Sequence, residues 1–470
     1  MSMVVQHNMQ AANANRMLGI TSGAQAKSTE KLSSGYKINR AADDAAGLTI
    51  SEKMRKQIRG LDKASSNAQD GVSSVQTAEG ALTEVHSMLQ RMNELAVQSA
   101  NGTNSSDDRQ AIQDEVDQLT TEIDRVAETT KFNEIYLLKG DNSNTKNVYM
   151  KGHDAGLKGT LTDGAKSATF TMDALQAGDK YTIAGKEYTI GSATKEVTAL
   201  IDKANTDATA DTANKTVDVN GKTYTITYSA AGNTIADADG IAITLDNLKK
   251  AVTGGSKVTY GNTSLTAMTD ADADGVDDDD SSIITKDVAE TKIKAELLTA
   301  NNIGTVDQAA TVEDANTANG KTSYTINKGY ATVADTLSFN LHVGADADMT
   351  NKITVDIDTM NSANLGIKGI NVKDASGTEA TYAIDAIADA VAKVSSQRSA
   401  LGAVQNRLEH TIDNLDNISE NTSSAESRIR DTDMAKEMVN YSKNNILAQA
   451  GQSMLAQANQ SNQGVLSLLQ

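Results

Sequence analysis

Residues 54–96 decide the fold: MRKQIRGLDKASSNAQDGVSSVQTAEGALTEVHSMLQRMNELA. Apolar or small residues return in this stretch at steps that alternate between three and four, which is the spacing of a coiled-coil seam. The pattern predicts one helix over about 44–100, roughly 85 Å long at 1.5 Å per residue. A helix of this length needs a partner along its seam. The seam positions are Met54, Ile58, Leu61, Ser65, Ala68, Val72, Val75, Ala78, Leu82, Val85, Leu89, Met92 and Ala96.

A matching seam lies near the other end of the chain and supplies that partner. The linker NGTNS at 101–105 separates the first helix from a second amphipathic helix. The simplest architecture is an antiparallel bundle in which the two ends of the chain meet and the middle projects as an insertion. The positions of the second seam are Leu401, Val404, Leu408, Thr411, Leu415, Ile418, Thr422, Ala425 and Ile429.

The two tails form weaker helices than the bundle. Residues 1–42 and the C-terminal tail are rich in Asn, Gln, Ser and Ala, with only scattered apolar residues. Such segments bury too little apolar surface to offset the entropy lost on ordering. We therefore expect helices that order only against partners.

The middle of the chain has a different composition and a different predicted structure. Residues 141–390 hold 36 acidic and 21 basic residues, so most of the formal net charge of −19 lies there. The segment Asn220-Gly221 precedes an alternating Thr/Tyr/Ile run, which predicts a hairpin with a tight turn at positive φ. Related runs begin at Ala184-Gly185 and Asn319-Gly320.

Three helices and a further hairpin complete the expected middle region. Together with the three turns they indicate one or two α+β modules. The fold class is therefore α+β: a long antiparallel helical bundle from the N- and C-terminal segments, with an inserted β-rich region. The helices are expected at about 192–205, 243–253 and 287–300, and the last hairpin joins Leu337–Val343 to Ile353–Ile357.

Composition argues against several classes of function. There is no cysteine for a disulfide framework or a thiolate metal site, and the five histidines are scattered. No nucleophile elbow, P-loop or dinucleotide fingerprint is present, so we expect neither an enzyme nor a cofactor. The acidic balance disfavours nucleic-acid binding, and no apolar run approaches the roughly 20 residues that span a bilayer. The N-terminus lacks the basic and apolar regions of a Sec signal peptide.

One acidic loop is a weak candidate metal site. Asp270, Asp272 and Asp274, followed by Gly275, match the start of an EF-hand calcium loop. Position twelve of that loop should supply a bidentate acid, but Ser281 stands there. A solvated surface loop is the favoured interpretation, with weak calcium binding as the alternative.

Several long segments at both ends resemble bacterial flagellin. The N-terminal segment LSSGYKIN at 32–39 and LQRMNELAVQSAN at 89–101 are similar to signatures of that family. So are LGAVQNR at 401–407 and the segment from QAG at 449–451 to QANQ at 457–460. The resemblance covers about 1–140 and 336–470.

The resemblance implies a division of the chain. Residues 1–43 and 432–470 would be terminal helices forming the inner tube of a hollow filament. Residues 44–140 and 336–431 would form the outer tube, and 141–335 would be a variable, surface-exposed insertion. The expected assembly positions are Val4, Val5, Met9, Leu18, Leu447, Met454, Leu455, Leu466 and Leu469.

The resemblance also implies partners and a location. The partners would be further copies of this chain, a flagellar export chaperone, and the cap and hook-junction proteins. The protein would leave by type III export, without a Sec signal, and lie in the extracellular flagellum. A vertebrate Toll-like receptor would bind at Arg91, Leu95, Gln98 and Glu115.

Three other functions compete with the filament subunit. A hook–filament junction protein shares the terminal helices and the export route. A calcium-dependent surface adhesin would use the acidic loop and the β-rich insertion. Deleting residues 141–335 tests the adhesin: loss of cell binding with intact filaments would show that adhesion is an additional role. The third function is that of a hydrolase embedded in the insertion, which metal-dependent turnover by the isolated insertion would support.

Overall fold

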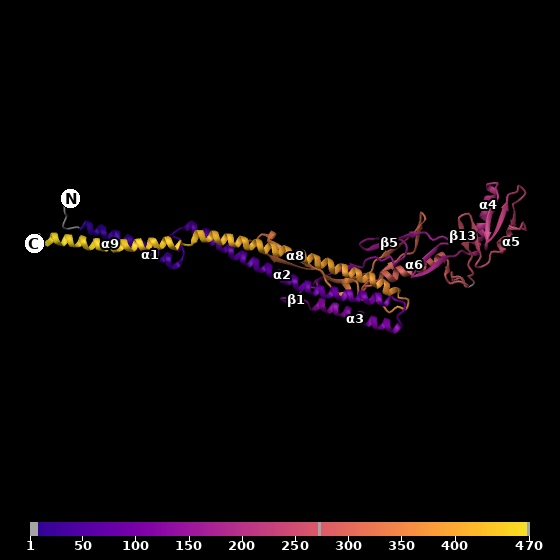
Figure 1. Ribbon diagram of the computed structural model, residues 1–470, viewed down its shortest axis with the longest axis horizontal. Helices are drawn as coiled ribbons and strands as arrows, with labels where there is room; N and C mark the ends of the chain where they lie inside the picture. The colour runs from indigo at the N-terminus through magenta and orange to yellow at the C-terminus, as the bar shows by residue number, and fades with distance from the viewer. Residues whose placement is uncertain (1–7, 271–273, 468–470) are drawn as a thin grey trace. The chain divides into compact units, whose positions relative to one another are not determined.

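The computed structural model describes residues 8–270 and 274–467, with side chains as far as Ser461 in the last helix. Contacts divide the chain into two compact units. Unit 1 holds both ends of the chain, and unit 2 holds the middle (Figure 1). Unit 1 comprises Met1–Val75, Phe339–Val355 and Ala403–Gln470, and unit 2 comprises Gln76–Ser338 and Asp356–Gly402.

The first and last helices of the chain lie side by side in unit 1 (Figure 1). These are α1 (Met9–Ser34) and α9 (Met434–Ser467). They run antiparallel, because Asn8 Nδ2 donates to the carbonyl of Ala458 at one end, and Thr432 N donates to the carbonyl of Gly35 at the other. Gly35 ends α1 with φ of 74°, the left-handed conformation that glycine adopts without strain.

The predicted seam is confirmed in unit 1, with one exception. Leu61 and Ala68 of α2 (Ala45–Ser99) are buried, as are Leu408 and Leu415 of α8 (Thr378–Arg430). Ile418 of the second seam is 37% exposed, so the apolar contact weakens beyond Leu415.

The expected last hairpin is also confirmed, and it packs on the two bundle helices of unit 1. Val343 and Ile353 of this hairpin share a buried cluster with Ala68 and Leu408. The strands are β19 (Leu337–His342) and β20 (Lys352–Ile357), with the short 3₁₀ helix η1 (Met349–Asn351) before β20.

Unit 2 holds the remaining parts of α2 and α8 together with a third helix. Leu82, Leu89 and Met92 of the seam are completely buried. The helix α3 (Ser106–Thr129) starts at a capping box, in which Ser105 and Asp108 each bond the other's backbone N–H. The hydroxyl and backbone N–H of Ser105 also lower the pKa of the Asp108 carboxyl.

Short strands and one small helix accompany this part of the bundle. In the pair β3–β18, Tyr149 lies opposite Tyr330. These elements are β1 (Lys131–Phe132) paired with β2 (Ile135–Tyr136), β3 (Asp141–Tyr149) paired with β18 (Tyr330–Asp335), and α7 (Ser362–Leu365).

The middle region holds two α+β modules, each with its own core. The first module buries Phe170 and Tyr324 from its larger sheet beside Ile293 of its helix. Its larger sheet has the order β15 (Thr311–Val312), β17 (Lys321–Asn327), β5 (Ser167–Asp173), β4 (Thr160–Asp163), with β16 (Asn316–Ala318) also on β17. Its smaller sheet has the order β14 (Ile283–Ile284), β7 (Lys186–Ile190), β6 (Lys180–Ile183), and its helix is α6 (Lys286–Asn301).

The second module is inserted within the first along the chain. Its helix α4 packs Val197 and Ile201 onto Val217 and Val258 of the sheet. The sheet has the order β11 (Ala242–Ile243), β10 (Thr234–Asp237), β9 (Lys222–Thr227), β8 (Lys215–Val219), β12 (Lys257–Tyr260), β13 (Thr263–Thr266). Its helices are α4 (Thr194–Ala210) and α5 (Leu245–Lys250), and with α6 they confirm the three helices expected in the middle region.

All three predicted turns join adjacent antiparallel strands. The turn at 184–185 joins β6 to β7, that at 220–221 joins β8 to β9, and that at 319–320 joins β16 to β17. The first and third turns belong to the first module and the second turn to the second module. The three turns lie in three different sheets, so the repeated turn sequence does not mark a repeated module.

Candidate interaction surfaces

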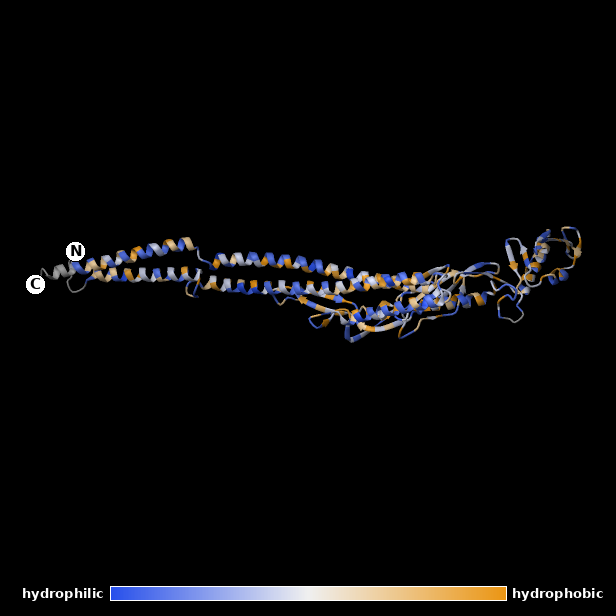
Figure 2. Cartoon of the chain, turned by 60° about the horizontal axis from the view of Figure 1, so that its bottom comes forward, coloured by the Kyte–Doolittle hydropathy of each residue, from blue (hydrophilic) through white to orange (hydrophobic). Residues whose placement is uncertain are grey.

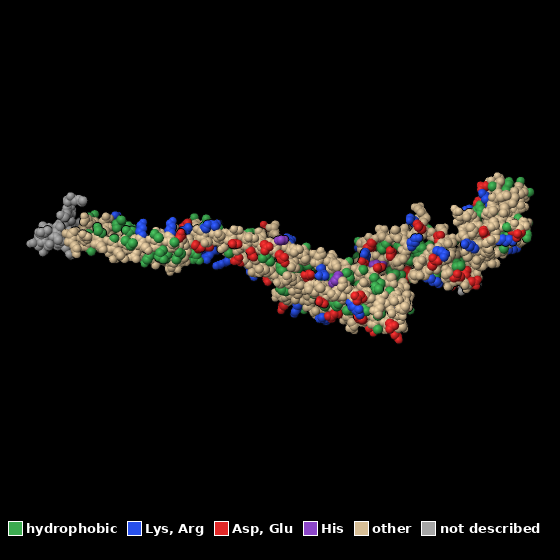
Figure 3. All heavy atoms as spheres, viewed as in Figure 1, with side chains coloured by type: hydrophobic (Ala, Val, Ile, Leu, Met, Phe, Trp, Pro, Cys, Tyr) green, Lys and Arg blue, Asp and Glu red, His purple; other side chains and the backbone are tan. Residues whose placement is uncertain are grey.

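The α1–α9 pair carries apolar side chains that the single chain leaves exposed. Hydrophobic side chains gather on the visible face of this pair in Figure 3, and apolar and polar residues alternate along both helices in Figure 2. Between the helices runs a groove of about 810 Å³, lined by Met17, Leu18, Leu447 and Met454 among polar residues. A face of this kind can bind another apolar helix.

The positions predicted for assembly fall on this pair or outside the described residues. Met9, Leu447 and Met454 are exposed, and Leu18 and Leu455 are half-buried. Val4, Val5 and Leu469 lie outside the described residues, as does the side chain of Leu466.

A tight junction joins the end of α1 to the end of α8, just before α9 begins. Lys37 N donates to the carbonyl of Arg430 at 2.7 Å, and the Arg430 guanidinium lies 4.9 Å from the centre of the Tyr36 ring. Arg430 also forms a 2.7 Å ion pair with Glu52, and this hydrogen bond lowers the pKa of the Glu52 carboxyl. The junction thus fastens the helix pair to α2.

The predicted receptor patch lies on α2 and α3 of unit 2. Arg91 Nε donates to Glu115 Oε1 at 2.9 Å, and Arg91 Nη1 donates to Glu94 Oε2 at 3.2 Å. The bond to Glu115, followed by that to Glu94, raises the pKa of Arg91. Arg91, Glu115 and Gln98 are exposed, whereas Leu95 is only 2% exposed. Leu95 therefore supports this surface from beneath.

Two buried polar residues of α3 were not predicted from the sequence. Arg109 donates to the carbonyls of Ser99 and Ala375, and Gln113 bonds the backbone at Ile370 and Val372. Both residues hold the segment between α7 and α8 against α3. The available signal was their position, because they lie on the apolar face of an amphipathic helix.

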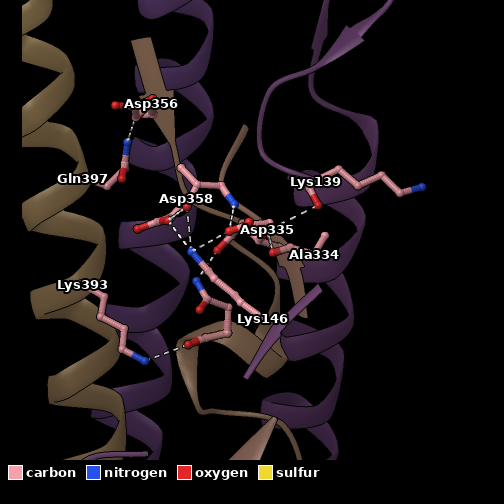
Figure 4. A network of polar contacts seen from close by, with 11 residues as sticks. Lys139, Lys146, Ala334, Asp335, Asp356, Asp358, Lys393 and Gln397 are labelled. Carbon is pink, nitrogen blue, oxygen red and sulfur yellow. Dashed lines mark hydrogen bonds and ion pairs between the residues drawn. The ribbon is translucent and has the colours of Figure 1, made fainter. Parts of the chain in front are cut away.

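A second polar network, which was also not predicted from the sequence, connects the ends of strands beside α8 (Figure 4). Lys146 Nζ of β3 donates to Asp358 Oδ1 at 2.8 Å and to Thr336 Oγ1 at 2.7 Å. Burial raises the pKa of Asp358, but the bonds from Lys146 and Thr336 outweigh it, so that pKa lies below 3.8. Beside it, Lys393 of α8 donates to the carbonyl of Asn364 at 2.7 Å, and burial lowers the pKa of Lys393.

A small pocket adjoins Lys393. It has a volume of about 320 Å³ and is lined by Met150, Leu365 and Ala386 together with the ion pair of Lys151 and Asp389. The network and the pocket wall together connect four segments that are distant in sequence. Their role is therefore structural.

The acidic loop directs carboxylates at its own backbone. Asp270 accepts from the N–H groups of Asp274 and Gly275, and Asp277 accepts from those of Thr269, Asp279 and Asp280. Asp272 lies outside the described residues. Within the described part of the chain, no group of three or more acidic, His or Cys residues is placed to hold a metal ion, and no helix is long and apolar enough to cross a membrane.

Comparison with known proteins gives matches over nearly the whole chain. The bacterial flagellin N-terminal helical region matches residues 5–143, and the bacterial flagellin C-terminal helical region matches residues 384–469. Flagellin of Clostridium tyrobutyricum is 40% identical over 467 residues, covering 98% of this chain and 100% of that protein. Flagellin of Salmonella rubislaw is 35% identical over 505 residues and covers 100% of both chains. Among solved structures, FliC from Burkholderia pseudomallei aligns at 19% identity over 72% of this chain and 99% of that chain, with a TM-score of 0.28.

Proposed function

This chain belongs to the bacterial flagellin family, the structural proteins of the extracellular flagellar filament, and we propose that it polymerises through its α1–α9 pair. In this proposal residues 1–43 and 432–470 form the inner tube. Residues 44–140 and 336–431 form the outer tube, and 141–335 face the medium. A contact of this kind joins different surfaces of neighbouring copies, and when it does not close into a ring it extends as a helical filament.

The observation that carries this proposal is the exposed apolar face of α9 and its groove with α1. Met454 is 62% exposed in the single chain, and Leu447 lies on the same groove. Burying such side chains gains about 25 cal/mol for each Å² removed from water. Because the same helices are weakly amphipathic, docking on a neighbouring copy supplies the apolar surface that they lack.

The chain offers a matched pair of variants for the test. Met454 and Ile241 are exposed to nearly the same extent, 62% and 64%, but Ile241 lies in the insertion. We expect Met454→Asp to abolish seeded polymerisation in sulfate, followed by negative-stain electron microscopy, and Ile241→Asp to give filaments of normal length. Normal filaments from Met454→Asp would contradict the proposal.

Truncation tests the inner-tube assignment separately. Removing residues 1–45 should leave a soluble, largely helical monomer that cannot polymerise. Circular dichroism checks that the remaining helices are folded. Normal filaments from this truncation would overturn the assignment, and full-length monomers that polymerise only when hook is added would favour the junction-protein alternative.

We also propose that the surface around Arg91 binds a vertebrate Toll-like receptor. The supporting observation is the ion pair between Arg91 and Glu115, which joins two helices and holds both side chains at the surface. Arg91 and Glu115 would contact the receptor with Gln98, and Leu95 would hold the patch from below.

A second ion pair on α3 is the control for this proposal. Arg125 and Glu122 are also exposed and paired, but they lie outside the patch. Exposed ion pairs contribute only about 0–1 kcal/mol to stability, so neither substitution should unfold the protein. We expect Arg91→Ala to weaken receptor activation in a reporter cell and Arg125→Ala to leave it unchanged. Equal activation by both variants would refute this role.

A further inference from the structure

Three turns of the insertion share one backbone conformation but differ in their first residue. Ala184, Asn220 and Asn319 have φ of 50°, 53° and 53°, and the glycine that follows each has φ between 73° and 79°. Both central residues at positive φ mark the tight primed turn of a two-residue hairpin. Among these three turns, the first central residue is alanine once and asparagine twice.

The two asparagine side chains have different surroundings. Asn220 Oδ1 accepts from Lys257 N at 2.8 Å, and Asn220 Nδ2 donates to Ser256 Oγ at 3.2 Å. Ser256 is buried, so this side chain is anchored to β12. The Asn319 side chain is exposed, and among the described residues it forms no hydrogen bond.

The backbone at the third turn leaves the nitrogen of Gly320 without a hydrogen bond among the described residues. The carbonyl of Gly320 accepts from Ala174 N at 3.0 Å, which holds the turn in place. Glycine has no Cβ, so the nitrogen that follows Asn319 is sterically open to the side-chain amide.

We propose that Asn319 is a site of spontaneous deamidation in the folded protein, and that the anchored Asn220 resists the same reaction. The Gly320 nitrogen loses its proton to base and attacks Asn319 Cγ, which forms a new N–C bond. The bond between Cγ and Nδ2 breaks, and ammonia leaves. Water then opens the resulting succinimide to aspartate or isoaspartate. Overall, one asparagine and one water are consumed, and one aspartate or isoaspartate and one ammonia are formed.

The anchoring of Asn220 sets the size of the expected difference. Its side chain must give up at least one hydrogen bond to turn towards the Gly221 nitrogen. A bond of ordinary net strength slows such a step by up to about tenfold. We therefore expect Asn319 to deamidate up to about tenfold faster than Asn220, although both precede glycine.

The product also changes the hairpin. Deamidation adds a negative charge at the end of a strand pair in which Ala318 faces Lys321. Isoaspartate adds a backbone carbon, which lengthens the loop and disturbs this register. The modified chain is thus distinguishable by charge as well as by peptide mass.

The test uses the full-length protein at mildly alkaline pH, sampled over time by peptide mapping and isoaspartate detection. Asn319 should convert before Asn220. Asn319→Ala should remove that signal and keep the turn, because Ala184 already occupies the same position elsewhere. Ser256→Ala should raise the Asn220 rate towards that of Asn319. Equal rates at Asn220 and Asn319 in the native protein would overturn the proposal.

Unfolding provides a second, independent readout. In denaturant both asparagines lose their surroundings, so the two rates should converge. If the ratio of the two deamidation rates is the same in native buffer and in denaturant, the difference comes from the local sequence. The structural explanation would then fail.

Discussion

The side-chain amide of Gln113 forms two hydrogen bonds with the backbone at Ile370 and Val372, one as donor and one as acceptor, as a neighbouring β-strand would. Its Oε1 accepts from Val372 N at 2.7 Å, and its Nε2 donates to the carbonyl of Ile370 at 2.9 Å. All three residues are buried or nearly so. One side chain of α3 thereby satisfies two backbone groups of the irregular segment that leads into α8.

We predict that Gln113→Ala lowers the free energy of unfolding by about 3 kcal/mol, because two buried backbone groups lose their partners. Gln110 is the control, since its bond to Asp114 is exposed. Gln110→Ala should change the free energy of unfolding by no more than about 0.5 kcal/mol. Urea unfolding followed by circular dichroism measures both, and equal effects would contradict the prediction.

Two glycines of α2 should respond oppositely to alanine. A Cβ on Gly80 meets no atom within 4 Å, so Gly80→Ala should stabilise by about 0.5–1 kcal/mol through helix propensity. A Cβ on Gly71 would lie 2.2 Å from Leu341 Cδ1 of the hairpin. Gly71→Ala should therefore destabilise by about 1–3 kcal/mol. Thermal unfolding of the two variants tests this prediction, which fails if both substitutions raise the midpoint temperature of unfolding.

The first turn carries a residue poorly suited to its conformation. Ala184 has φ of 50°, which costs an L-residue without a polar side chain about 1–2 kcal/mol. Ala184→Gly should recover about 1 kcal/mol of stability, less a small entropic cost of glycine in the unfolded chain. Protection of the β6–β7 amides in hydrogen exchange measures this. Faster exchange in the variant would contradict the assigned strain.

The Lys146 network predicts a pH dependence. Because the folded pKa of Asp358 lies below its ordinary 3.8, its contribution to stability is present above that value and is lost as pH falls through the lower folded pKa. The Asp358→Asn variant should therefore lose less stability than the native chain between about pH 5 and pH 2. Parallel curves of unfolding free energy against pH for the two proteins would rule this out.

Local features of the fold were predictable from the sequence. The alternating steps of three and four predicted the buried faces of α2 and α8, and Leu82, Leu89 and Leu408 are indeed buried. The turns at 220–221 and 319–320 were predictable because Asn-Gly tolerates positive φ, and the turn at 184–185 was predictable because the sequence that follows it is similar. The receptor patch was predictable only through the family resemblance, and the burial of Leu95 appeared only in the structure.

Other features had no local signal. Ile418 continues the seam by spacing, but its side chain is 37% exposed. The third hairpin buries Thr322 and Tyr324, whereas its relatives leave the matching tyrosines half-buried. The extra residue Ser323 shifts the strand relative to its turn, and the sheet it joins decides which face is covered.

The sequence by itself determined the helices, the turns and the α+β class, because each follows from the spacing of neighbouring residues. It indicated the family through the resemblance of several long segments at its two ends. Only the tertiary structure decided that β5 pairs with β17 across the inserted second module, and that Gln113 and Lys146 hold distant backbone segments. Those choices depend on which surfaces fit together once the chain is compact. Periodicity describes a residue's place on its own element, and it does not identify the partner on another.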